Sequence, residues 1–229
     1  MEPASTRAFR LAGNTHPVPV HAALVLAALA VGESLISAAG DDPALQATAR
    51  ALRAFGVDLT VRGGDWRVRG VGIGGLAEPA APIDLTDAPA ALPLILGLAA
   101  GHPITCFVTG RPDPAQARLI EPLQRHGARF LLRDDHALPL GVAGARHPLP
   151  QDHRLTMPAP DVRAAILLAG LNAPGITRII EPAAGDGTIE ALLGHFGAEV
   201  RRYAADGAHV VELTGQPELA PRQIALAAP

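Results

Sequence analysis

The sequence predicts an α+β domain of three related units, each with the element order βαβαββ. We expect the units to surround a pseudo-threefold axis, with buried helices inside and sheets outside. A leucine precedes a glycine by four positions three times, at Gly56, Gly127 and Gly197, which are 71 and 70 residues apart. Such a fixed period indicates repeated supersecondary units. Upstream of each of these glycines lies a stretch that would form a helix with apolar residues on nearly every face. A helix of that kind is buried in the core.

The apolar stretches are the first helices that we predict in each unit. They share a high content of Leu, Ala, Ile and Val, and lie at 22–31, 90–100 and 163–171. Each ends near a glycine and is followed by a short strand, at 34–37, 104–108 and 177–180. Further strands are predicted at 82–85 and 153–157. The units are therefore expected to span about 21–81, 82–151 and 152–220, within one domain over 21–220.

The second helix of each unit is predicted to end at the repeated glycine, which can take the left-handed conformation of a helix C-cap. A hairpin follows, with turns at 63–65, 134–135 and 206–207 and second strands at 66–69, 137–140 and 209–213. Phe55 and Phe196 each precede a repeated glycine, so we expect both rings to be buried at equivalent sites. We also place His126 and His195 at matching positions of the repeat, which favours a structural role for both.

Composition excludes several classes of function. The chain has 229 residues and a net charge of -3, so it has no basic surface for nucleic acid or anionic membranes. Its longest apolar stretch, 22–31, is too short to span a bilayer. The start lacks the regions of a signal peptide, and the single cysteine, Cys106, can form no disulfide within the chain. We therefore expect a cytoplasmic protein with no nucleic-acid or membrane partner.

The chemistry of the side chains is also restricted. All 19 basic residues are Arg, so Schiff-base chemistry and proton transfer by an ammonium group are excluded. The nine histidines include no i, i+4 pair beside a carboxylate ligand set. No metal and no cofactor is therefore expected.

Several stretches carry a resemblance to a known family. They lie at 28–34, 66–76, 167–175 and 195–200. In them the chain resembles one of the two domains of enolpyruvyl transferases of the 5-enolpyruvylshikimate-3-phosphate synthase type. The resemblance covers nearly all of this chain but about half of a complete family member. It implies that segments 1–20 and 221–229 resemble the places where the family's chain crosses between its two domains.

The resemblance implies a reaction as well. Family members transfer an enolpyruvyl group from phosphoenolpyruvate to shikimate-3-phosphate in the cleft between their domains, so half of that site would lie outside this chain. Both substrates are polyanions, which require several cations, and proton transfers require a carboxylate and a lysine.

Each motif that the resemblance leads us to expect is altered. The family's Asp-Lys-Ser has no counterpart around His16 to Ala22, and Pro93 stands where an Arg is expected. The family's Asn-Ser/Ala-Gly-Thr loop, its Ser-Ser/Ala-Gln and its Arg-Asp-His-Thr-Glu correspond here to 86–91, 159–161 and 186–190. These segments place the carboxylates Asp87, Asp161 and Asp186 at positions that are neutral or basic in the family.

These departures predict a degenerate, non-catalytic homologue with no catalytic residue. It would serve as a binding or assembly partner, associating with a protein or with itself through the face that lines the family's cleft. Arg111, Arg118 and Arg163 are the candidates for substrate binding. The alternative is a divergent active enolpyruvyl transferase completed by a partner chain. A remote alternative is an S-adenosylmethionine-dependent methyltransferase, because 179–188 places an acidic residue and glycines between a strand and a helix.

Overall fold

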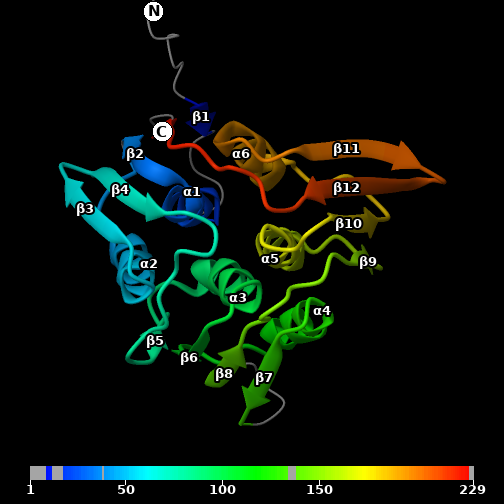
Figure 1. Cartoon of the computed structure of the whole chain (residues 1–229), viewed down its shortest axis with the longest axis horizontal. Coiled ribbons are helices and arrows are strands. Elements are labelled where there is room, and N and C mark those ends of the chain that lie inside the picture. The colour runs from blue at the N-terminus through cyan, green and yellow to red at the C-terminus, as the bar shows by residue number, and fades with distance from the viewer. Residues whose placement is uncertain (1–8, 12–17, 38, 134–137, 227–229) are drawn as a thin grey trace, which may run out of the picture.

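A computed structural model describes residues 9–11, 18–37, 39–133 and 138–226. The fold is the predicted one: three units, each with a buried helix, a covering helix and an outer sheet (Figure 1). The turn predicted at 134–135 lies outside the described residues. Among those residues, no helix combines the length and the apolarity that crossing a bilayer requires.

The first unit contains α1 (Val18–Leu29), β2 (Val31–Ser37), α2 (Pro43–Ala54), β3 (Asp58–Arg62) and β4 (Asp65–Val71). Its sheet has the order β1-β13-β2-β4-β3. The edge strand β1 (Phe9–Leu11) and its neighbour β13 (Gln223–Leu226) come from the two ends of the chain and pair in parallel. The first sheet therefore joins segments more than 200 residues apart in the sequence, Phe9 opposite Ile224.

The second and third units repeat this order with short additions. The second contains β5 (Ile83–Asp84), the 3-10 helix η1 (Pro89–Ala91), α3 (Leu92–Ala100), β6 (Thr105–Thr109), the 3-10 helix η2 (Pro114–Leu119), α4 (Ile120–Arg125), β7 (Arg129–Leu132) and β8 (Leu140–Ala143). The third contains β9 (Asp152–Arg154), α5 (Pro160–Gly170), β10 (Ile176–Glu181), α6 (Thr188–Phe196), β11 (Val200–Ala205) and β12 (Ala208–Thr214). Their sheets have the orders β5-β6-β8-β7 and β11-β12-β10-β9.

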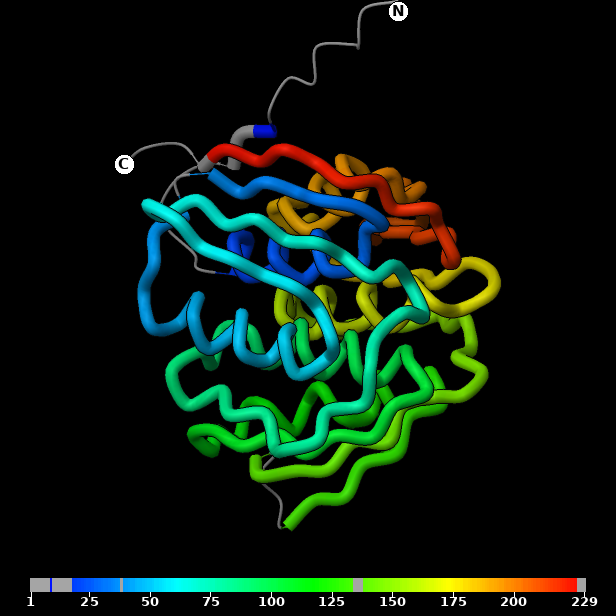
Figure 2. Tube along the Cα trace, turned by 60° about the vertical axis from the view of Figure 1, so that its left-hand side comes forward, coloured from blue at the N-terminus to red at the C-terminus, as the bar shows by residue number. Residues whose placement is uncertain are grey.

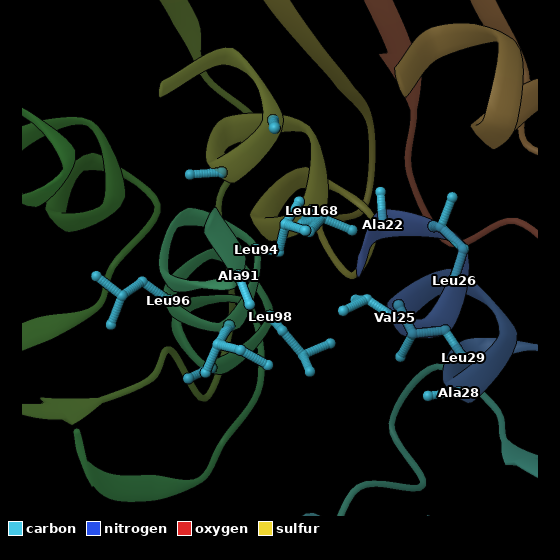
Figure 3. Close-up of a cluster of buried hydrophobic side chains, with 14 of the residues drawn as sticks. Ala22, Val25, Leu26, Ala28, Leu29, Ala91, Leu94, Leu96, Leu98 and Leu168 are labelled. Atoms are coloured by element: carbon cyan, nitrogen blue, oxygen red, sulfur yellow. The ribbon is translucent and has the colours of Figure 1, made fainter. Parts of the chain in front are cut away.

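The core consists of α1, α3 and α5, which are seen nearly end-on at the centre of Figure 1. Leucine and alanine side chains fill the space between them (Figure 3). Helices α3 and α5 approach at backbone contact: a Cβ atom on Gly97 would lie 2.4 Å from the carbonyl oxygen of Ala165, and one on Gly101 2.7 Å from that of Ala169. Only glycine fits at these two positions, because a side chain there would push the helices apart.

The end of each second helix has the predicted form. Gly56, Gly127 and Gly197 have φ angles of +87°, +104° and +109°, the left-handed region that favours glycine after a helix. Phe55 and Phe196 are completely buried. The prediction for these two rings is therefore confirmed.

One repeat assignment was wrong. His126, not His195, occupies the position of Phe55 and Phe196 and is equally buried. In all three units the carbonyl of this residue accepts a backbone N–H from the following linker: Ala77 to Phe55 (2.8 Å), Leu149 to His126 (3.1 Å) and Ala220 to Phe196 (2.9 Å). His195 lies one position earlier, is half-buried, and stacks on Phe9 with ring centroids 4.8 Å apart.

The strand predicted at 137–140 was also misplaced, since β8 spans Leu140–Ala143. Pro139 has no backbone N–H to donate to a sheet ladder, so it is confined to the loop before the strand. The other helices and strands lie within a few residues of their predicted places.

Burial makes the neutral form of His126 necessary. Its Nδ1–H donates to the carbonyl of Leu149 (2.9 Å), so its Nε2 accepts the Nε2–H of His153 at 3.1 Å. Burial lowers the pKa of His126 to about 4 and that of His153 to about 3. Burial likewise lowers the pKa of His21 to about 4; this ring donates to Thr48 and joins α1 to α2.

Replacing Phe196 by Ala is expected to lower the free energy of unfolding by about 3–5 kcal/mol, because a fully buried ring leaves a cavity. The matched control is Phe107→Ala on the outer face of β6, where the side chain is 53% exposed and the change should be within about 1 kcal/mol. Urea denaturation measures both. Equal losses would contradict the placement of Phe196 in the core.

Stability is expected to fall as the pH falls from about 6.5 to about 4, because the unfolded histidines bind protons that the buried ones do not. His126→Phe introduces the residue that the other two units carry and should make the pH dependence of the urea midpoint shallower. If His126→Phe keeps the wild-type pH dependence of the urea midpoint, the pair of His126 and His153 does not titrate as described.

Candidate functional site

The altered motifs gather at the N-terminal ends of α3, α5 and α6. Asp87 precedes η1, Asp161 lies in the first turn of α5, and Asp186 lies just before α6. No side chain caps the N-terminus of α3 or α5. Helix N-termini carry partial positive charge, so carboxylates there are stabilised by the helices themselves. His16 and Pro17 of the first altered motif lie outside the described residues.

Arg111 is the exposed candidate. It lines a groove of about 470 Å³ together with Thr86, Asp87 and the N-terminus of α2. Within the described part of the chain, its guanidinium forms no ion pair. On the groove's wall, Asp87 lies 3.9 Å from Arg50. Thr86, also on the wall, donates hydrogen bonds from its hydroxyl and N–H to Asp84, and these lower the pKa of Asp84. The groove therefore offers one free cation among carboxylates.

Arg118 is ion-paired to the new carboxylate Asp161. Its Nη2 and Nε both donate to Oδ2 of Asp161, at 2.7 and 3.2 Å. The pair joins η2 of the second unit to the first turn of α5 in the third. An anion that approached Arg118, whose side chain is 48% exposed, would meet this carboxylate beside the guanidinium.

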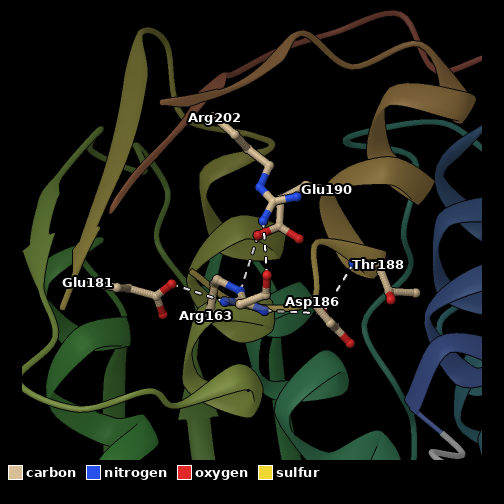
Figure 4. A network of polar contacts seen from close by, with 7 residues as sticks. Arg163, Glu181, Asp186, Thr188, Glu190 and Arg202 are labelled. Carbon is tan, nitrogen blue, oxygen red and sulfur yellow. Dashed lines mark hydrogen bonds and ion pairs between the residues drawn. The ribbon is translucent and has the colours of Figure 1, made fainter. Parts of the chain in front are cut away.

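Arg163 lies in a buried cluster of charges at the start of α5 (Figure 4). Its side chain is 3% exposed and contacts three carboxylates: Glu181 at 3.0 Å, Glu190 at 3.2 Å and Asp186 at 3.4 Å. Glu181 and Glu190 are also buried, whereas Asp186 is exposed. Three negative groups thus surround one positive group, which leaves no charge on Arg163 for a substrate anion.

The glycines of the 179–188 segment leave space for the guanidinium groups of Arg163 and Arg202. A Cβ on Gly185 would lie 1.7 Å from Nη1 of Arg163, and one on Gly187 would lie 1.9 Å from Nη1 of Arg202. Arg202 also donates to the carbonyl of Gly185 at 2.9 Å. Strand β10 pairs antiparallel with β12, so the segment does not belong to a wholly parallel sheet. The loop packs against two guanidinium groups, and the methyltransferase alternative gains no support from it.

The structure does not bring the three candidate arginines to one point. Arg118 and Arg163 are each held by carboxylates of this chain, and Arg111 lies apart from them in its groove. Glu181, Glu190 and Arg202 were not among the residues predicted from the sequence. A signal for Glu190 was present, since the segment 186–190 retains the final Glu of the family's Arg-Asp-His-Thr-Glu motif. Among the described residues, no group of three or more His, Cys, Asp or Glu is placed to hold a metal ion.

The sequence profile of EPSP synthase (3-phosphoshikimate 1-carboxyvinyltransferase) matches residues 19–225. The chain is 42% identical to the 3-phosphoshikimate 1-carboxyvinyltransferase of Paramagnetospirillum magneticum over 235 residues, which cover 98% of this chain and 52% of that protein. It is 44% identical to the protein of that name in Rhodospirillum rubrum over 209 residues, 87% of this chain and 46% of that one. The chain thus spans about half the length of the curated relatives it matches.

Solved structures share the fold. EPSP synthase from Acinetobacter baumannii superposes with a TM-score of 0.81 at 24% identity, covering 96% of this chain and 50% of that one. The enolpyruvyl transferase NikO from Streptomyces tendae gives a TM-score of 0.66 at 15% identity, over 97% of this chain and 51% of that one.

Arg163→Met is expected to lower the free energy of unfolding by about 3–5 kcal/mol, because it leaves Glu181 and Glu190 buried without a counter-charge. Arg118→Met, which breaks a more exposed pair, should cost about 1 kcal/mol or less. Urea denaturation compares the two variants. Replacing Glu181 and Glu190 by Gln in the Arg163→Met background should recover part of the loss, and equal losses in the two single variants would contradict the assignment.

Proposed function

The chain belongs to the EPSP synthase family, and we propose that it is a non-catalytic member, which binds or assembles with a partner protein instead of transferring an enolpyruvyl group. The observation that carries this proposal is the internal pairing of Arg118 and Arg163. Catalysis of this transfer requires that cations of the protein remain available to two polyanions. Here carboxylates of the same chain occupy them.

The free energy expected for phosphate binding at Arg118 supports the proposed non-catalytic role. A phosphate group that displaced Asp161 from Arg118 would gain one charge-assisted contact and lose another, so its net binding energy would be small. Arg111 is a single cation, whereas two polyanionic substrates need several.

The lysine that the family's motif would supply has no counterpart, because the chain contains none. Glu190 is the retained carboxylate of the altered motifs, and it contacts the Nε of Arg163 at 3.2 Å in a buried position. A substrate in solution cannot reach this carboxylate, because its side chain is only 3% exposed. This arrangement supports a structural role for the motif that remains.

The alternative is a divergent transferase completed by a partner chain. In that case Arg111, as the one candidate whose guanidinium has no ion pair among the described residues, would be the residue that first meets the substrate anion.

Isothermal titration calorimetry with shikimate-3-phosphate and with phosphoenolpyruvate tests the proposal, with the full-length Paramagnetospirillum magneticum relative as a positive control. We expect no saturable heat from either compound with this chain, and no release of inorganic phosphate when both are present. Saturable binding that Arg111→Gln abolishes would contradict the proposal and favour the alternative.

A further inference from the structure

The outer faces of the second and third sheets differ at equivalent positions. In the third sheet, Arg201 of β11 lies opposite Glu212 of β12, which lies opposite Arg178 of β10. The row is tightly paired: Arg178 donates to Glu212 at 2.8 Å and to Asp152 of β9 at 3.0 Å. This outer face is thus covered by charges of alternating sign.

The same row of the second sheet is apolar. Leu131 of β7 lies opposite Gly141 of β8, which lies opposite Phe107 of β6. Leu131 is 69% exposed and Phe107 53% exposed. A Cβ on Gly141 would lie 3.1 Å from the ring of Phe107, so the ring lies over the glycine. Leu131 and Phe107 therefore form one exposed apolar patch above Gly141, which is itself buried.

The charge beside the patch is reversed relative to the other units. Two residues after each repeated glycine stand Asp58, Arg129 and Glu199. Asp58 faces Arg69 across its hairpin and Glu199 pairs with Arg201, but Arg129 faces Ala143. In the described part of the chain Arg129 has no ion pair.

A small hollow adjoins Arg129. It has a volume of about 330 Å³, and both Arg129 and Arg146 line it. The acidic residue Glu78 lines it as well, but its Oε2 already accepts the N–H of Thr105 at 2.7 Å. An anion in the hollow would therefore meet two guanidinium groups and one carboxylate that is already hydrogen-bonded.

Among the described residues, β7 pairs on one side only, with β8, so its other side is an edge of the sheet. It ends the order β5-β6-β8-β7 and lies at the outer margin of the molecule (Figures 1 and 2). An edge strand presents backbone donors and acceptors to any extended chain that comes beside it. The apolar patch, the unpaired Arg129 and the free edge thus lie on one strand.

We infer that β7 and the patch bind an extended acidic segment of a partner protein, which adds a strand to the second sheet. Such addition gives affinity through the backbone and specificity through alternate side chains. One apolar side chain of the segment would cover Leu131 and Phe107, and a carboxylate two residues along would meet Arg129. A second copy of this chain is disfavoured, because antiparallel β7 strands centred on Leu131 would oppose Arg129 and Arg133. The inference does not depend on whether the other face binds shikimate-3-phosphate.

Fluorescence anisotropy with three labelled heptapeptides tests this docking surface on the whole chain. The peptide SETFTES places acidic and apolar side chains on one face of a strand, SKTFTKS reverses the charges, and SETSTES removes the apolar group. We expect saturable binding of SETFTES. The other two peptides should bind about tenfold more weakly or show no detectable binding.

Variants separate the surface from non-specific attraction. Leu131→Arg gives the second sheet the residue of the third and should weaken binding of SETFTES at least about tenfold. Arg129→Glu should reverse the preference toward SKTFTKS. Thr60→Arg, at the equivalent exposed position of the first sheet, should leave binding unchanged.

Three results would overturn the inference. The first is no saturable binding of SETFTES by the wild-type chain, and the second is equal binding of all three peptides. The third is a concentration-dependent dimer in sedimentation that Leu131→Arg dissociates, which would identify a second copy as the occupant.

Discussion

Backbone contact between the buried helices is the constraint on which the rest of the structure depends. Gly97 and Gly101 let α3 approach the carbonyl groups of Ala165 and Ala169 on α5. Helices this apolar must be covered on all sides, and three sheets with three amphipathic helices provide that cover. Because the three units repeat the same order of elements, this cover forms a pseudo-threefold arrangement around the helices.

Charged side chains at the N-terminal ends of α5 and α6 pair with one another. Asp161 and Asp186 provide negative charge near the starts of α5 and α6. Arg118 pairs with Asp161 and so ties two units together, and Arg163, which contacts Asp186, fills the space that Gly185 leaves.

Most of the fold could be predicted because its signals are local. Apolar runs, glycines at a fixed period and paired turns each occupy a few adjacent residues, and they located the helices and most strands. One error lay in the reading of the repeat. His126 directly precedes Gly127 as Phe196 precedes Gly197, so the sequence already matches His126, not His195, to Phe196. The backbone bonds from Leu149 and Ala220 agree with this register. The pairing of β1 with β13 depends on segments from opposite ends of the chain, which no local pattern relates.

The candidate site was less predictable, because charge pairing is a property of three-dimensional neighbours. The sequence identified Arg118 and Arg163 as cations. It also identified Asp161 and Asp186 as carboxylates at positions that are neutral or basic in the family. It could not show that these residues neutralise one another, since Arg118 and Asp161 are 43 positions apart. It also gave no reason to expect that Glu181, at the end of an apolar strand, reaches back to α5.

The most direct test of this account is a titration of inorganic phosphate followed by ³¹P NMR, on the wild-type chain and on Asp161→Gln, which frees Arg118. We predict that Asp161→Gln broadens or shifts the phosphate signal more than the wild-type chain does, and that adding Arg118→Met to the variant restores the wild-type response. Equal responses from the wild-type chain and a folded Asp161→Gln variant would contradict the claim that an internal carboxylate keeps Arg118 from binding anions.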